Sequence, residues 1–208
     1  MQNIKFDKTG SSEFSKTLHL RVNDYFKTSN KNRHGDRSMV IKTILMLATF
    51  FIPLILIGSS LVTSTVLLFG LYILSGMGMA GIGMGVMHDA IHGSYSKSPV
   101  VNKYLGYTMN LIGANANVWR IQHNVLHHSY TNIDHGDDDI NAPFFLRFSP
   151  NAKHYWIHRF QYLYIWFFYG LSTISWITTK DFVRANRYKK MGYFKANGNF
   201  KKELLKIM

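Results

Sequence analysis

Five histidines form two clusters whose spacing suits metal binding. His88 and His92 make an H-x-x-x-H pair, and His123, His127 and His128 make an H-x-x-x-H-H group. Residues four apart on an α-helix lie ~6 Å apart along the axis and on one face, so each pair can turn two imidazoles toward one point. Neutral imidazole binds Zn, Cu, Fe and Ni, whereas Ca, Mg and iron–sulfur sites need carboxylates or thiolates. The spacing therefore predicts a metal centre between two facing helices.

A histidine that stands alone more often has an ordinary surface or hydrogen-bonded position. We expect this of His19 and His34, which lie far from the clusters in the sequence. Eight of the ten histidines, however, lie between His88 and His158, and this concentration argues against a chance grouping.

The first cluster directly follows a long apolar segment. From Thr43 to Met87 there are 45 residues without a charged residue or histidine, and Gly58-Ser59-Ser60 divides them. This length is enough for two membrane spans of about 20 residues each. The first 42 residues carry nine Lys/Arg against four Asp/Glu, so the positive-inside rule places Lys42 in the cytoplasm. The sequence predicts an all-α membrane protein whose transmembrane helical hairpin returns His88 to the cytoplasmic side.

The net charge of +13 raises the question of nucleic-acid binding. The basic residues flank apolar segments and accompany no nucleic-acid motif, so we exclude nucleic acid and expect membrane lipids with anionic head groups as partners. The first 38 residues are too polar for a secretory signal peptide, and the absence of cysteine says little about the compartment.

We expect one domain over residues 1–208, divided into five segments. These are a cytoplasmic lead-in (1–38), a two-helix membrane hairpin (40–87), a cytoplasmic region with the histidine clusters (88–159), an aromatic interfacial or membrane helix (160–178) and a basic tail (179–208).

Two of these segments allow alternative interpretations. In the lead-in, apolar residues from Phe14 to Phe26 recur on one face behind a cap at Ser11 or Ser12, which fits either an interfacial or an ordinary packing helix. Phe160 to Thr178 has 19 uncharged residues and could span a membrane. Because residues 180–208 carry nine Lys/Arg against two acids, a single crossing would place them on the wrong side, so we favour an interfacial helix.

Several glycines lie just before the first histidine cluster. The segment from Gly76 to Gly81 matches a dinucleotide-binding pattern, but it lies inside the apolar run with no preceding strand. Gly81 and Gly85 are better explained as a small-residue face for close helix packing.

Four aspartates, Asp134, Asp137, Asp138 and Asp139, surround Gly136. They are additional metal ligands, or they hold imidazoles in one tautomer, or they form a solvated loop, and the loop is the most frequent case.

The chain resembles the membrane fatty-acid desaturases, and in particular the front-end, linoleoyl-CoA desaturase-like type. The resemblance rests on His88-Asp-Ala-Ile-His92-Gly-Ser, on Trp119-Arg-Ile-Gln-His123-Asn-Val-Leu-His127-His128-Ser-Tyr-Thr-Asn, and on Gly136-Asp-Asp-Asp-Ile140. One H-x-x-x-H box is weak evidence. Both boxes, about 30 residues apart and directly after an apolar hairpin, form a specific signature.

The resemblance implies four spanning helices and a cytoplasmic cap that holds two Fe ions in a di-iron centre. It further implies O2 as oxidant, a cis double bond as product, and a fatty acyl-CoA or acyl-lipid as substrate. The iron ligands and catalytic residues would be His88, His92, His123, His127 and His128. The acyl chain would lie in an apolar tunnel, for which Trp119 and Gln122 are candidates, although ordinary packing also explains them. The implied location is a bacterial inner membrane, with the N-terminus and the histidine boxes in the cytoplasm.

Two features of the family are absent from residues 1–208. Family members have a third box, of the H/Q-x-x-H-H type, beyond two further spans, and no such box occurs here. We therefore expect this sequence to correspond to the N-terminal part of a desaturase and to be inactive alone. A His-Pro-Gly-Gly haem motif is also absent, so electrons would come from a separate donor such as ferredoxin or cytochrome b5.

Two other functions remain open from the residues. A membrane hydroxylase would use the same di-iron site to form an alcohol. A non-enzymatic membrane protein could bind or transport metal, but transport ligands should lie near the middle of the bilayer, whereas these clusters begin where the apolar run ends.

Overall fold

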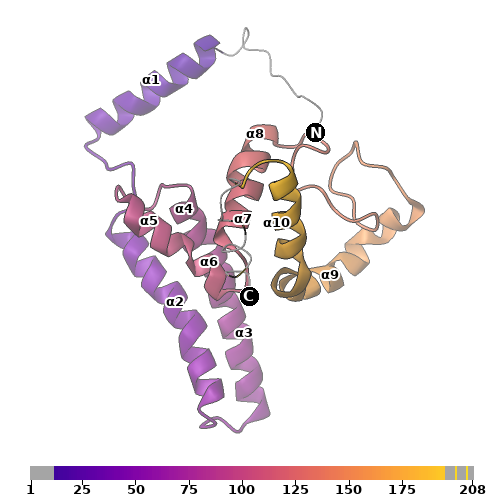
Figure 1. The fold of residues 1–208 in the computed structure, drawn as a ribbon. Helices are drawn as coiled ribbons and strands as arrows, with labels where there is room; N and C mark the ends of the chain where they lie inside the picture. Colours follow the sequence, from indigo (N-terminus) through magenta and orange to yellow (C-terminus); the bar gives the residue numbers. More distant parts are fainter. Residues whose placement is uncertain (1–11, 195–199, 201–204, 206–208) are drawn as a thin grey trace.

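The computed structural model describes residues 12–194 together with residues 200 and 205. Within these residues every regular element is a helix, which confirms the predicted all-α class (Figure 1). The α-helices are α1 (Ser12–Thr28), α2 (Arg37–Gly58), α3 (Thr65–Gly81), α4 (His88–Ile91), α5 (Pro99–Gly106), α6 (Thr108–Leu111), α7 (Ala116–Arg120), α8 (His128–Tyr130), α9 (Gln161–Ser175) and α10 (Asp181–Lys190). Three π-helical segments, η1 (Ile82–Met87), η2 (Ile121–His127) and η4 (Trp176–Lys180), and one 3-10 helix, η3 (Trp156–Phe160), join them.

The apolar run folds into two long helices that meet at the predicted turn. α2 begins at Arg37 because the Asp36 carboxylate accepts hydrogen bonds from the backbone N–H of Ser38 (2.9 Å) and Met39 (3.3 Å). It ends at Gly58, and α3, η1 and α4 then continue as one helix from Thr65 to Ile91. Among the described residues, these are the two helices long and apolar enough to cross a membrane.

α2 and α3 lie side by side, and glycine permits their close approach (Figure 1). A Cβ atom added to Gly78 would lie 2.5 Å from the backbone nitrogen of Phe50. Next to this contact, the Ser75 hydroxyl donates a hydrogen bond of 3.2 Å to the Phe50 carbonyl. Gly81 and Gly85 do form a small-residue face, but the tightest backbone contact is one turn earlier, at Gly78.

Gly81 and Gly85 face side chains of α2. A Cβ atom at Gly81 would overlap the Met46 side chain, and one at Gly85 would lie 3.2 Å from Lys42 Nζ. The packing partner of this face is thus the first helix of the same pair. Lys42 therefore lies near the end of the second helix that carries His88. There its Nζ is 3.6 Å from Asp89 Oδ2.

Two small buried clusters connect the long helices to the rest of the chain. The first joins α2, η1, α4 and α6 through Phe50, Ile82, Met87, Ile91, Met109 and Ile112, with Ala114 and Ala116. The second joins α7 and η2 to α10 through Val118, Leu126, Ala185 and Tyr188. These clusters fix the mutual position of α4 and η2, which carry the histidines.

α1 and α9 contribute little to these clusters. The apolar face of α1 is exposed, with Phe14 at 72% of its full accessibility, so α1 is not an ordinary packing helix in this structure. The proposed cap at Ser11 or Ser12 lies outside the described residues and side chains. α9 is a helix, as predicted, and none of its residues is buried.

We predict that Gly78→Leu destabilises the packing of α2 on α3. The added side chain would overlap the Phe50 backbone, and overpacking of this kind costs about 1–3 kcal/mol. Gly76→Leu is the matched control, because a Cβ atom at Gly76 meets nothing within 4 Å. Thermal unfolding of the detergent-solubilised protein measures the difference. Equal stability of the two variants would show that the helices do not approach closely at Gly78.

Candidate metal centre

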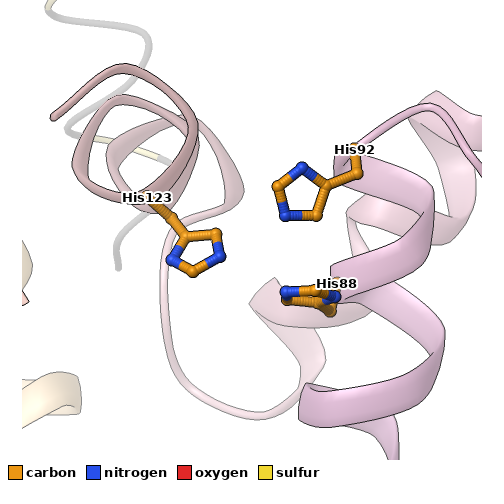
Figure 2. Close-up of side chains that lie close together, drawn as sticks. All are labelled: His88, His92 and His123. Atoms are coloured by element: carbon orange, nitrogen blue, oxygen red, sulfur yellow. The ribbon is translucent and has the colours of Figure 1, made fainter. Parts of the chain in front are cut away.

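The two histidine clusters meet between α4 and η2. Figure 2 shows His88 and His92 on one helix facing His123 on the other. One ligand nitrogen from each of the three lies within 4.8 Å of the others. The ring centroids of His88 and His92 are 4.5 Å apart, and each lies 5.2 Å from the His123 centroid. This arrangement matches the predicted convergence of the clusters.

The other two histidines of the second cluster join the same group. His127 stacks on His123 with a centroid separation of 5.0 Å, and the His128 ring lies 4.8 Å from the rings of both His92 and His123. His123, His127 and Asp139 form a second set of ligand atoms within 4.8 Å of one another. The five imidazoles thus form one continuous cluster, in which His123 belongs to both sets.

The donor set fits a bound metal ion. His123 Nε2 is buried and has no hydrogen-bond partner in the described part of the chain. A buried polar atom without a partner costs roughly 1–3 kcal/mol, and a metal ion would satisfy it. A cluster of five imidazoles is also the donor set that suits iron, zinc or copper.

Desolvation and the neighbouring histidines lower the pKa of two of the imidazoles. Desolvation, together with repulsion from His88 and His123, lowers the pKa of His92 to about 4. Desolvation and the same kind of repulsion from His123 also lower the pKa of His128. At neutral pH the nitrogen lone pairs of both rings are therefore available to a metal.

Carboxylates orient the imidazoles of the second cluster. His123 Nδ1 lies 3.0 Å from Asp139 Oδ2, and His127 Nδ1 lies 3.0 Å from both Asp137 oxygens. A carboxylate at Nδ1 favours the proton there and leaves Nε2 free for a metal. Burial tends to raise the pKa of Asp139, but its hydrogen bonds with His123 and Gln122 outweigh this and lower the pKa.

The solvated-loop interpretation of these aspartates is wrong for two of them. Asp137 is 0% exposed and Asp138 is 3% exposed. Only tertiary packing could bury them, because the sequence around Gly136 is that of an exposed turn. Asp134, unlike these two, lies beside the exposed His135, with 3.5 Å between Asp134 Oδ2 and His135 Nε2.

α10 fixes the aspartate loop from behind. The Tyr188 hydroxyl and the Arg187 guanidinium both donate to the Asp138 carboxylate. Burial works to raise the pKa of Asp138, but these two hydrogen bonds hold it below the usual value. The same contact and the burial of the ring raise the pKa of Tyr188. Asp138 therefore remains ionised and anchors the loop whose neighbours orient His123 and His127.

α10 belongs to the site, although residues 179–208 were predicted to be a basic tail. A signal was present in the sequence, because Asp181, Arg184, Ala185 and Tyr188 recur at the spacing of one helix face. In the structure Asp181 accepts a hydrogen bond from the backbone N–H of Asn115 at the start of α7. Burial raises the pKa of Asp181.

An apolar cavity of about 500 Å³ opens beside the cluster. Its lining includes His88 and Trp119 together with Met87, Met109, Ile112 and Trp176. Trp119 also stacks on His123, with ring centroids 4.3 Å apart. Trp176 of η4 also lines this cavity, although it was not among the tunnel residues predicted from the sequence.

Gln122 lies elsewhere. It does not line the apolar cavity but donates a hydrogen bond to Asp139.

Of the remaining histidines, His158 has partners outside the cluster. Its Nε2 lies 2.8 Å from the Phe144 carbonyl oxygen, and its Nδ1 accepts a hydrogen bond from the Tyr155 backbone N–H. These contacts give His158 a structural role in the loop before α9.

The chain is similar to known desaturases. Residues 62–201 match the family model described as fatty acid desaturase. A sn-1 linoleoyl-lipid 6-desaturase of Arthrospira platensis is 36% identical over 169 residues, which cover 78% of this chain and 44% of that protein. A protein of the same name from Synechocystis sp. is 33% identical over 188 residues (90% of this chain, 52% of that protein). An acyl-lipid (8-3)-desaturase of Physcomitrium patens is 31% identical over 185 residues (86% and 38%).

The chain thus spans about half the length of these relatives. No solved structure matches it.

We predict that Tyr188→Phe loosens the aspartate loop. The variant keeps the ring but leaves the buried Asp138 carboxylate one donor short, which should lower the free energy of unfolding by about 1–3 kcal/mol. Tyr162→Phe, on the exposed face of α9, is the control and should change nothing. Thermal unfolding gives the stability, and Co(II) titration followed by absorbance gives the metal affinity, which should fall with it. Two indistinguishable variants would remove Tyr188 from the support of the site.

Proposed function

Because the chain belongs to the fatty acid desaturase family, we propose that it serves in O2-dependent, di-iron desaturation of a fatty acyl chain. The observation that carries this proposal is the cluster of five imidazoles, one of which, His88, lines an apolar cavity. Desaturation needs both parts, since an oxidant must meet one carbon of an otherwise featureless chain. The product would be an acyl chain with a new cis double bond, formed in lipid metabolism.

The histidines would hold the metal. We assign His88, His92, His123, His127 and His128 as iron ligands, because their rings already converge and the carboxylates Asp137 and Asp139 orient two of them. When bound, the two iron ions with O2 would supply the oxidising power that removal of hydrogen from an unactivated methylene requires. The protein's own part is to fix the ligands and keep water away from the reacting carbon.

The apolar cavity would hold the acyl chain. Its methionine and isoleucine side chains offer no hydrogen bonds and its tryptophans offer only an indole N–H, so the length and bend of the cavity would select the carbon that lies nearest to His88. Trp119 lines the cavity and stacks on His123, so it would position the part of the acyl chain that lies nearest to His88. The relatives are named acyl-lipid desaturases, which supports an acyl-lipid over an acyl-CoA as the substrate.

The long helices would place this site at a membrane surface. Arg37–Gly58 and Thr65–Ile91 are apolar enough to span, and both have their charged ends on the histidine side. The excess of Lys/Arg before Lys42 would place this side in the cytoplasm, in a bacterial inner membrane. The exposed aromatic face of α9 would lie in the interface of the bilayer.

Residues 1–208 would belong to one domain, divided into the five segments expected from the sequence. Electrons would come from a separate protein such as ferredoxin or cytochrome b5.

A chimera tests the enzymatic proposal. In it this chain replaces the matching segment of the Arthrospira platensis relative, and a host without the activity expresses it. We expect unsaturated product and bound iron from the chimera. Loss of one ligand, in His92→Ala or His127→Ala, should lower product at least ~10-fold, because even outer-shell changes cost 10–100-fold at metal sites. His19→Ala, on exposed α1, is the control and should keep full activity.

Residues 1–208 alone, expressed in parallel, should give no product, because five clustered imidazoles cannot fill two histidine-rich iron shells. Full product from His92→Ala would refute the ligand assignment, and turnover by the 208 residues alone would require another ligand set.

Cysteine labelling tests the membrane topology. The chain has no cysteine, so single substitutions report without background. In sealed inside-out vesicles, Lys153→Cys and Lys190→Cys, which flank α9, should react with a membrane-impermeant maleimide, and Ser60→Cys, between α2 and α3, should not. Labelling of Lys153→Cys and Lys190→Cys from opposite sides would show that α9 crosses the membrane. Lys190 represents the basic tail in this experiment, because Lys195 lies outside the described residues.

A further inference from the structure

A second cavity, of about 510 Å³, lies next to α4 and differs from the apolar one in its chemistry. Its walls come from α4, α5, α7 and the linker before α2, and it contains Ile91 but neither His88 nor His92. We propose that this cavity binds a phosphate ester. The proposal does not depend on the metal or on desaturation.

The cavity is lined by cations without counter-ions. Lys97, Lys103 and Arg120 stand around it, and no carboxylate is among the lining residues. Within the described residues none of the three forms an ion pair. Like charges that gather around one hollow raise its positive potential and attract an anion.

The positive surface continues beyond the cavity. A second hollow, of about 490 Å³, shares His34 and Lys97 with it and adds Lys27, Lys31 and Arg33 from the end of α1 and the following linker. No carboxylate lines this hollow either. An anionic ligand would therefore be guided toward the cavity from the side of α1.

The walls are fixed independently of any ligand. Asn102 donates hydrogen bonds to the carbonyls of Ser96 (2.8 Å) and Gly93 (3.2 Å) and accepts one from the Ser96 backbone N–H (2.9 Å). The Gly35 backbone N–H donates to the Tyr95 carbonyl at 3.1 Å, which ties the linker before α2 to the same loop. The cavity is thus built by contacts that leave its cations free.

The floor of the cavity is made of small residues. Ala90, Gly106 and Ala116 are buried there and leave depth that larger side chains would fill. The charged groups stand above this floor on exposed side chains. A compact group with several acceptor oxygens could reach all three cations at once.

One polar atom in the wall lacks a partner. His34 Nδ1 is buried and makes no hydrogen bond within the described part of the chain. With a proton at this position, the ring would donate to an oxygen of the bound ligand and so recover the cost of its burial. Three cations and an imidazole donor match the oxygens of a phosphate better than the single negative charge of a carboxylate.

The position of the cavity allows two sources for the phosphate. It lies beside Ile91, where the second candidate span ends, so the head group of an anionic lipid could enter it. A soluble phosphate ester would offer the same chemistry. The experiment must therefore include both.

Calorimetric titration of the metal-free, detergent-solubilised chain tests the proposal. The probes are dioctanoyl phosphatidic acid for the lipid source and glycerol 3-phosphate for the soluble source. We expect at least one of them to bind, and the binding to weaken as salt is added. Binding of the lipid alone identifies a head-group site, and equal binding of both identifies a site for soluble phosphate esters.

Charge-neutral variants decide whether the cavity is responsible. The variant Lys97→Gln/Lys103→Gln/Arg120→Gln should weaken binding at least ~10-fold, given the contribution of each cation near an anionic group. The matched control, Lys16→Gln/Lys153→Gln/Arg159→Gln, removes the same charge from exposed sites elsewhere and should bind normally.

His34→Phe gives an independent variant that keeps all three cations and removes the imidazole donor, and it too should weaken binding. Thermal unfolding verifies that each variant is folded. Absence of binding by both probes, or equal loss in the cavity and control triple variants, would overturn the proposal.

Discussion

The contact between the Asp137–Asp139 loop and its two neighbouring helices is the interaction on which the site depends. On one side the loop meets His123 and His127 of η2, and on the other it meets Arg187 and Tyr188 of α10. Buried carboxylates are stable only when charged or polar partners satisfy them. Each aspartate therefore requires its partners, and the imidazoles keep their orientation because α10 holds the loop that orients them.

The two long helices set where this site lies. Close packing at Gly78 brings α2 and α3 together, and the continuous helix from Thr65 carries His88 to the level of the first turns of α2, where Lys42 pairs with Asp89. The π-helical segment η1 directly precedes His88, and η2 contains His123 and His127. π-helical turns are frequent at functional sites, since the extra residue widens the helix and shifts the side chains that follow. Here they lie within both helices that carry the clustered histidines.

α4 separates two cavities of opposite character. His88 lines the apolar cavity, next to Met87 of η1, whereas Ala90 and Ile91 line the cationic cavity. One short helix thus adjoins an apolar space beside the imidazole cluster and a positive space away from it. The two proposals together place an acyl-binding and a phosphate-binding environment within a few residues of each other, and none of the five clustered histidines lines the cationic cavity.

The sequence by itself determined the two long helices, the turn at Gly58 and the two histidine clusters, because charge-free length and helical spacing are properties of a continuous segment and do not depend on what packs against it. It also suggested that aspartates support the histidines, but it favoured a solvated loop. Only the tertiary structure decided that Asp137 and Asp138 are buried. The decisive partner of Asp138, Tyr188, is 50 residues away in the chain, and no local pattern encodes that contact. The same holds for Trp176 at the apolar cavity and for Gln122, whose bond to Asp139 joins residues 17 apart. Spacing along a helix shows which side chains share a face, whereas packing between helices determines what that face meets.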